Sequence, residues 1–201
     1  MENFPKIPET HKKALLTMLN HLHNLFKENN IIYSLDGGGN LGLIRHNGHM
    51  IPWDDDLDLL VFDKQWLKML SVLPQLKDDF YQMNYTVNQN IVKVFIPNMW
   101  GKIDDNIIGT PTIDIFKWKK SNGLIELENK NDRKIFKNCF YKKDELFPLK
   151  LYDFEGLKIY APNDPKPYLR RYYGNDYLTN FKYDKRREDS IMEKESINLN
   201  A

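Results

Sequence analysis

Four aspartates fall within five positions of the chain, at Asp54, Asp55, Asp56 and Asp58. The apolar residues 57–62 predict a strand, along which residues two apart share a face, so Asp56 and Asp58 are expected to project together. Two adjacent carboxylates repel each other unless a proton or a cation lies between them. A hard divalent cation such as Mg²⁺ takes oxygen ligands and bridges to phosphates. A solvated acidic turn is the alternative interpretation of the same run.

A glycine-rich segment precedes these acids. Residues 31–35 predict a strand, Asp36-Gly37-Gly38-Gly39 a turn that ends it, and residues 40–45 a short helix. Glycines allow backbone N–H groups to approach an anion closely, and the positive end of the helix would point at the same place. A glycine turn next to paired carboxylates favours a site for a metal ion and a phosphate over a solvated acidic turn.

Two further charged residues interrupt predicted strands. Asp114 lies at the centre of residues 112–116, and an isolated carboxylate in such a strand is costly unless it is paired or bound to a metal. The alternative is the polar face of an edge strand. Lys93 alternates with valines in residues 91–96, so it faces either the active site or solvent.

The stretch GGGNLGLIRHNGHMIPWDDDLDL resembles the signature of the LicD/fukutin-type phosphotransferases, roughly GG(T/S)LLGxxRHxGxIPWDDDxD. That family belongs to the nucleotidyltransferase-fold superfamily, which has a glycine turn, a DxD pair on one strand and a third carboxylate on a neighbouring strand. Two departures are evident. Gly39 stands where the family has Thr or Ser, and the segment from Arg45 to Asp54 is one residue longer than in the family pattern.

The resemblance implies an α+β fold, with a nucleotidyltransferase-like mixed β-sheet flanked by helices in a single domain. It also implies Mg²⁺-dependent transfer of a phospho-alcohol, such as phosphocholine or ribitol phosphate, from a CDP-linked donor to a hydroxyl of a glycan or glycoconjugate. Mn²⁺ is the alternative metal. The alternative functions are transfer of NMP from an NTP, and an inactive relative that binds nucleotide or glycan. The predicted catalytic and metal-binding residues are Asp56, Asp58 and Asp114, and the predicted substrate-binding residues are Gly37, Gly38, Arg45, His46, Lys93 and Arg170.

Composition limits the remaining classes. The chain has 201 residues, 41% of them hydrophobic, which is enough for one domain with a real core. The formal net charge of +1 argues against nucleic acid as a partner. A single cysteine, Cys139, suits a reducing compartment and a structural thiol. The N-terminal residues lack an apolar signal segment and no run is long enough to span a membrane, so a soluble, cytoplasmic protein is expected.

The rest of the chain predicts elements that hold the site. Thr10 begins a helix with an apolar stripe at three- and four-residue spacing, and its three histidines are expected at the surface. Residues 1–180 are expected to form the catalytic domain and residues 181–201 a charged, flexible tail. A further helix is expected over 64–73, packed through Trp66, Leu67 and Leu70, and a last helix is expected to be capped by Asn163 or Asp164 and ended by Gly174. Strands are expected over 83–87, 91–96, 135–141 and 145–147. The segments between them are expected to form a loop over 98–110 with solvated Asp104 and Asp105, a hairpin or insertion over 118–131, and a hairpin that turns at Glu155-Gly156.

Overall fold

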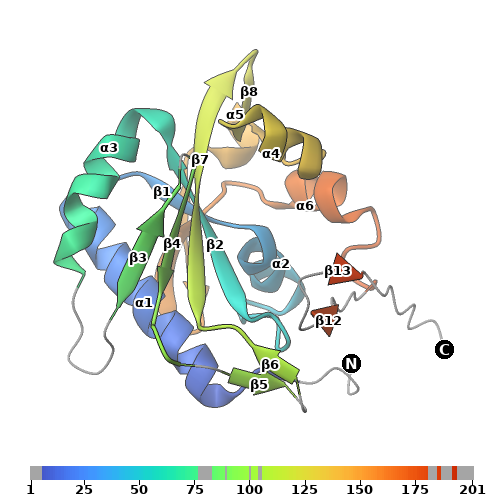
Figure 1. Cartoon of the computed structure of the whole chain (residues 1–201). Coiled ribbons are helices and arrows are strands. Elements are labelled where there is room, and N and C mark those ends of the chain that lie inside the picture. Colours follow the sequence, from blue (N-terminus) through green and yellow to red (C-terminus); the bar gives the residue numbers. More distant parts are fainter. Residues whose placement is uncertain are drawn as a thin grey trace.

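A mixed β-sheet forms the centre of the computed structural model, with helices on both of its faces (Figure 1). The structure describes residues 6–76, 83–88, 90–99, 101–103, 106–180, 185–186 and 192–193. The sheet has seven strands in the order β1-β2-β7-β4-β3, with β8 paired to β7 and to β9, and only β2 and β7 run parallel. The expected α+β mixed sheet flanked by helices is confirmed. The strands are β1 (Tyr33–Asp36), β2 (Asp56–Phe62), β3 (Asn84–Val87), β4 (Ile91–Phe95), β7 (Thr112–Ser121), β8 (Leu124–Leu127) and β9 (Phe140–Lys142).

One face of the sheet packs against α1 (Glu9–Glu28), α3 (Asp63–Val72) and the hairpin of β10 (Lys150–Phe154) and β11 (Leu157–Ala161). The expected apolar stripe of α1 is buried in this larger core. The expectation of surface histidines on α1 is wrong for two of the three, because His11 and His23 are buried. Both lie beside the apolar stripe, and each has a hydrogen-bond partner that makes its burial tolerable.

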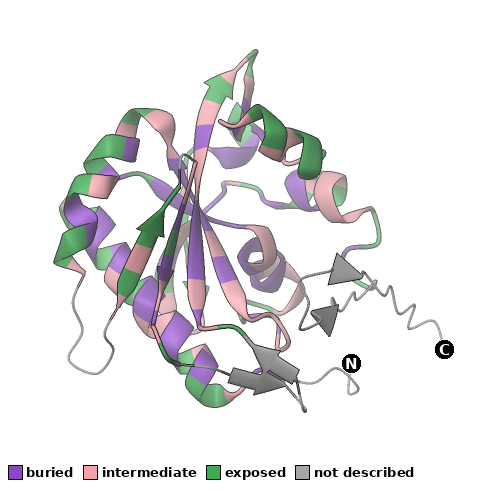
Figure 2. Cartoon of the chain, in the orientation of Figure 1, coloured by how far each residue is buried: buried purple, intermediate pink, exposed green. Residues whose placement is uncertain are grey.

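The other face packs against α2 (Gly37–Arg45) and α6 (Lys166–Tyr173). Leu60, Trp118 and Tyr141 from the sheet form a second core with Leu41 of α2 and Tyr168 of α6. Figure 2 shows that buried residues concentrate in the central strands and on the inner sides of the helices. Among the residues that the structure describes, no helix combines the length and apolar composition needed to span a membrane.

Several predicted boundaries are wrong for identifiable reasons. The three glycines begin α2 itself instead of forming a turn before it. Residues 145–147 are not a strand: they fall at the end of the short helix α5 (Lys143–Leu146), where the Glu145 carboxylate accepts the Lys142 N–H at 2.9 Å. Leu67 is 80% exposed, and Met69 and Val72 pack α3 in its place, together with Trp66.

The polar segments of the chain depart further from the predicted elements. A short helix, α4 (Lys130–Ile135), precedes β9, so the strand expected over 135–141 is confined to its last part. The loop expected over 98–110 contains β5 (Gly101–Ile103) and β6 (Asn106–Ile108), while Asp104 and Asp105 lie outside the described residues. The structure adds a 3₁₀ turn, η1 (Leu73–Gln75), and two short strands, β12 (Lys185–Arg186) and β13 (Met192–Glu193). The predicted tail otherwise lies outside the described residues.

The turn expected at Glu155-Gly156 is confirmed, and a hairpin lies within residues 118–131, where a hairpin or an insertion was expected. The β7–β8 hairpin turns at Asn122 and Gly123, and the β10–β11 hairpin at Glu155 and Gly156, all with positive φ. Asp164 accepts the backbone N–H of Lys166 at the start of α6, at 3.2 Å.

Candidate active site

A row of charged side chains crosses four neighbouring strands on the face that α2 and α6 cover. Asp36 of β1 pairs in register with Asp58 of β2, Asp58 with Asp114 of β7, and Asp114 with Lys93 of β4. Residues that are direct cross-strand neighbours project to the same face. Asp56 lies two residues before Asp58 and therefore shares that face. The structure thus brings together the three predicted catalytic carboxylates and the predicted lysine.

The alternation of β2 explains why the acids face this way. Leu57, Leu59 and Val61 belong to the core beneath α1 and α3. The residues between them must therefore point to the opposite face, as the sequence predicted. Asp58 and Asp56 are half-buried there, next to the N-terminus of α2.

The pKa values of two carboxylates of this row, Asp58 and Asp36, are raised. Burial is the largest cause that raises the pKa of Asp58, and the neighbouring charges of Asp56, Asp36, Asp114 and Asp54 raise it further. Burial also raises the pKa of Asp36 to about 6, although hydrogen bonds to its carboxylate oppose the shift. A site with this much negative charge favours either protonation or a bound cation.

The glycines of α2 make room for two carboxylates. A Cβ at Gly37 would overlap Asp58 Oδ2, and a Cβ at Gly38 would overlap Asp54 Oδ2. Gly37 also has a φ of +51°, which a side chain would strain. The positive end of α2 therefore lies against the acids. That Gly37 and Gly38 also bind a substrate phosphate stays a prediction.

Lys93 contacts the row directly. Its Nζ donates to Asp114 Oδ2 at 2.5 Å, while 52% of the lysine side chain is exposed. Asp114 itself is 9% exposed. Of the two faces that the sequence left open for Lys93, the structure places it on the face of the carboxylates. Its binding to substrate stays a prediction.

The predicted Arg45 lies at the end of α2, beside the C-terminal part of the described chain. Its Nη1 donates to the carbonyl oxygens of Tyr177 and Asn180, both at 3.4 Å. Burial lowers the pKa of Arg45, and the nearby charge of Asp54 opposes that shift. Arg45 therefore connects the segment after α6 to the loop that carries Asp54. Its binding to substrate stays a prediction.

The two other predicted substrate contacts lie in different surroundings. The ring of His46 meets Trp53 edge-on, with 5.8 Å between ring centroids. Burial, followed by the charge of Arg45, lowers the pKa of His46 to about 4. This imidazole is therefore neutral at pH 7. Arg170 is exposed on α6, and its contribution to substrate binding stays a prediction.

Cys139 has a structural position. Its Sγ lies 3.6 Å from the Tyr168 hydroxyl, and burial raises its pKa. A thiol whose pKa is raised is a poor nucleophile, in agreement with the structural role expected for it.

The donor set suits a hard divalent cation. The candidate ligands are all carboxylate oxygens, which Mg²⁺ and Mn²⁺ prefer. Among the described residues, the group of acids that brings one carboxylate oxygen each within 4.8 Å of one another is Asp54, Asp55 and Asp56, and it shares only Asp56 with the predicted metal-binding set. The carboxylates present therefore fit such an ion.

A sequence profile described as "LicD/FKTN/FKRP, nucleotidyltransferase domain" matches residues 30–164. The chain belongs to the LicD family. The matched residues include every predicted carboxylate of the site, whereas Arg170 lies outside them. LicD membership supports a transferase role of the phosphotransferase or nucleotidyltransferase type.

Relatives of this LicD chain are found among bacterial proteins. An uncharacterized protein from Rickettsia typhi is 32% identical over 168 residues, covering 84% of this chain and 48% of that protein. The chain thus spans about half the length of this relative. The lipopolysaccharide cholinephosphotransferase LicD of Haemophilus influenzae is 38% identical over 68 residues, covering 34% of this chain and 25% of that protein. The crystal structure of ANT(2")-Ia in complex with adenylyl-2"-tobramycin aligns with a TM-score of 0.44 at 11% identity, over 74% of this chain and 68% of that chain.

The sequence did not reveal the residues that hold the loop before β2, which carries Asp54 and Asp55, in place. His11 Nε2 lies 2.8 Å from the Asp55 carbonyl oxygen, and the Ile7 N–H donates to the Pro52 carbonyl at 2.8 Å. On the other side, Glu155 accepts the backbone N–H of Met50 at 2.7 Å. The position of His11 in the helical period of the apolar stripe of α1 was a usable signal for its burial.

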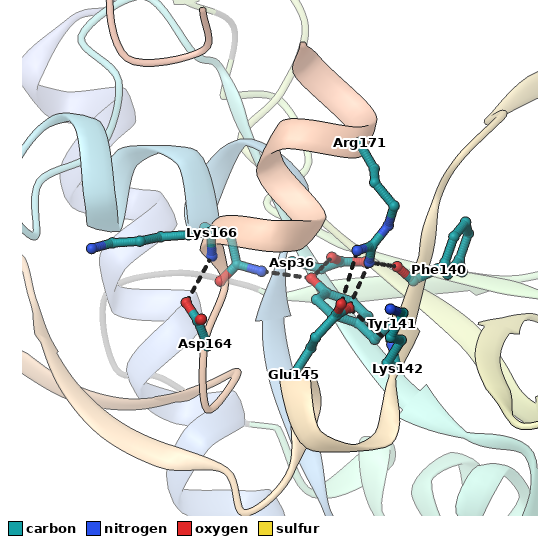
Figure 3. Close-up of polar contacts among 9 residues, drawn as sticks. Asp36, Phe140, Tyr141, Lys142, Glu145, Asp164, Lys166 and Arg171 are labelled. Atoms are coloured by element: carbon teal, nitrogen blue, oxygen red, sulfur yellow. Dashed lines mark hydrogen bonds and ion pairs between the residues drawn. The ribbon is translucent and has the colours of Figure 1, made fainter. Parts of the chain in front are cut away.

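Sequence reasoning also missed a buried polar chain behind the row (Figure 3). Tyr141 donates its hydroxyl to Asp36 Oδ1 at 2.8 Å, and Asn40 Nδ2 donates to the same hydroxyl oxygen at 2.8 Å. Beside it, Arg171 of α6 binds both carboxylate oxygens of Glu145, at 2.9 and 2.6 Å. Asp36 and Tyr141 are 105 positions apart, so no local pattern could pair them.

Proposed function

We propose that this LicD-family protein transfers a phospho-alcohol from a CDP-linked donor to a hydroxyl of a glycan or glycoconjugate. The observation that carries the proposal is the in-register pairing of Asp58 with Asp114, with Asp56 on the same face. This arrangement places three carboxylates from two parallel strands on one face of the sheet. The similarity to a lipopolysaccharide cholinephosphotransferase supports the choice of reaction.

The same three carboxylates would hold Mg²⁺, or Mn²⁺ as the alternative. The chemistry that such an ion would supply is positive charge, which offsets the charge of the donor phosphates. Asp56 and Asp58 come from one strand, so their spacing is fixed by the strand geometry. Asp114 is fixed by the parallel pairing of β7 with β2. The site is therefore built on rigid strands, which suits a reaction that depends on positioning.

The proposed transfer is a substitution at phosphorus. The acceptor hydroxyl oxygen forms a bond to the phosphorus that carries the alcohol, and the bond from that phosphorus to the bridging oxygen breaks, releasing CMP. Asp114, which lies between Asp58 and Lys93 in the row, would take the hydroxyl proton in place of holding the ion, or would hold a second ion. Lys93 would leave Asp114 for the departing phosphate, since its half-exposed side chain can move.

A nucleotidyltransferase that moves NMP from an NTP is the second candidate, favoured by the description of the matching domain. Both reactions use the same carboxylates and differ in the phosphorus that is attacked. Ligand-binding measurements are therefore needed to distinguish the two reactions.

The test is calorimetric titration of CDP-choline, CDP-ribitol, CTP and ATP, each with and without Mg²⁺, into the wild type and Asp58→Ala. The proposal predicts Mg²⁺-dependent binding of a CDP-alcohol that is lost in Asp58→Ala. Tight binding of an NTP without binding of any CDP-alcohol would favour nucleotidyl transfer. Equal CDP-alcohol binding by Asp58→Ala would contradict the metal site.

A further inference from the structure

Asp36 extends the carboxylate row beyond the three acids assigned to the cation. It is the last residue of β1, and its direct cross-strand partner is Asp58. It is 4% exposed, the most deeply buried carboxylate of the row. Its charge therefore acts through a medium of low polarity, in which electrostatic interactions are stronger than in water.

Hydrogen bonds keep the Asp36 carboxylate in place. Its Oδ1 accepts from Tyr141 (Figure 3). The Tyr141 hydroxyl oxygen accepts from Asn40 in turn, and Tyr141 and Asn40 are both fully buried. The Tyr168 hydroxyl and the Gly37 N–H lie near this carboxylate and favour its charged form, which opposes the rise in its pKa that burial causes. The hydrogen bond from Tyr141 fixes the orientation of the Asp36 carboxylate and engages one of its two oxygens, Oδ1.

Packing fixes these donors in turn. The Tyr141 ring stacks on Tyr168 of α6 with 4.3 Å between centroids and an interplanar angle of 17°. The Trp118 ring also packs against Tyr141, with 5.5 Å between ring centroids. The tyrosine that holds Asp36 is thus itself held by α6 and β7.

We propose that Asp36 is a positioning residue of the cation site, a fourth carboxylate that strengthens binding of the divalent ion through its charge without ligating it. This inference rests on the proposed function, because it concerns the same ion. Tyr141 and Asn40 keep the charge at a fixed distance from Asp58. The row then carries one more negative charge than its three ligands supply.

The test is Mn²⁺ binding by the whole chain at pH 8, followed by the EPR signal of the free ion and without any substrate. Asp36→Asn keeps an oxygen that can accept from Tyr141 and removes only the charge, and Asp36→Ala is a second neutral variant. Tyr141→Phe disturbs the same buried chain but keeps the charge. Asp153→Asn removes an exposed carboxylate and is the control for net charge. Near-UV circular dichroism shows which variants are folded.

The inference predicts that each folded neutral variant of Asp36 raises the Mn²⁺ dissociation constant about tenfold, given the strength of charge interactions at a partly buried site. Tyr141→Phe and Asp153→Asn should stay within about threefold of the wild type. Unchanged affinity in the Asp36 variants would overturn the role of Asp36 and leave the proposed function standing. An equal loss in Tyr141→Phe would also overturn it, because the effect would then be structural. Failure of the wild type to bind Mn²⁺ would overturn the metal site of the proposed function as well.

Discussion

Replacing Asp36 by asparagine is expected to change how the stability of the cation-free protein depends on pH. The wild-type carboxylate is buried, and burial raises its pKa from the ordinary 3.8 to about 6. The folded state therefore binds a proton more tightly than the unfolded state does. Asparagine keeps the acceptor for the Tyr141 hydroxyl but has no proton to lose.

The sign and size follow from proton linkage. Because the folded-state pKa lies above the unfolded one, the stability contributed by protonated Asp36 is present below pH 4 and is lost as pH rises through about 6. A change in pKa from 3.8 to about 6 corresponds to about 3 kcal/mol, since one pH unit is worth about 1.36 kcal/mol. About 2 kcal/mol of this loss falls between pH 4.5 and pH 8. The raised pKa of Asp58 acts in the same direction.

Urea unfolding in EDTA at several pH values measures the effect. The free energy of unfolding of Asp36→Asn relative to wild type should rise by about 2 kcal/mol from pH 4.5 to pH 8. Asp153→Asn, at an exposed position, should show a difference that is flat within about 0.5 kcal/mol. A flat difference for Asp36→Asn, or one that falls with pH, would refute the argument that this carboxylate is costly to ionise in the folded protein.

Three other substitutions test the surroundings of the row. His11→Leu removes the hydrogen bond to the Asp55 carbonyl and should cost about 1–3 kcal/mol by urea unfolding; an unchanged midpoint would mean that the bond does not hold the loop. Gly37→Ala places a Cβ against Asp58 Oδ2 at a positive φ, and should cost about 1 kcal/mol and weaken Mn²⁺ binding; wild-type Mn²⁺ affinity would contradict this. Arg171→Met leaves the buried carboxylate of α5 without its partner and should cost about 3 kcal/mol at unchanged Mn²⁺ affinity per folded molecule; thermal unfolding at the wild-type midpoint would show that the ion pair contributes little.

Local patterns in the sequence were sufficient where one rule controls the outcome. The alternation of residues 56–61 predicted which side chains of β2 face the core, since a strand allows only two faces. Asp114 was predicted on the site face for the same reason. The turn at Glu155-Gly156 was predicted because glycine adopts a positive φ readily and is a common turn residue.

Other features depend on contacts between distant segments. The short helix over residues 143–146 is supported by the Glu145 carboxylate, which caps its first turn and pairs with Arg171. The pair with Arg171 joins residues 26 positions apart and is not visible in a short window. The part played by Asp36 depends on Tyr141, which the fold brings from another strand. His11 could have been predicted from its helical phase, but its polar side chain suggested the surface until Asp55 was placed beside it.

Diffraction from crystals grown with MnCl₂, recorded where manganese scatters anomalously, tests the central claim most directly. The account predicts an anomalous peak shared by Asp56 and Asp58, facing Asp114 and absent from crystals of Asp58→Ala. A manganese ion held only by Asp54 and Asp55, away from the row, would contradict the account. So would crystals that contain bound nucleotide but show no manganese between β2 and β7.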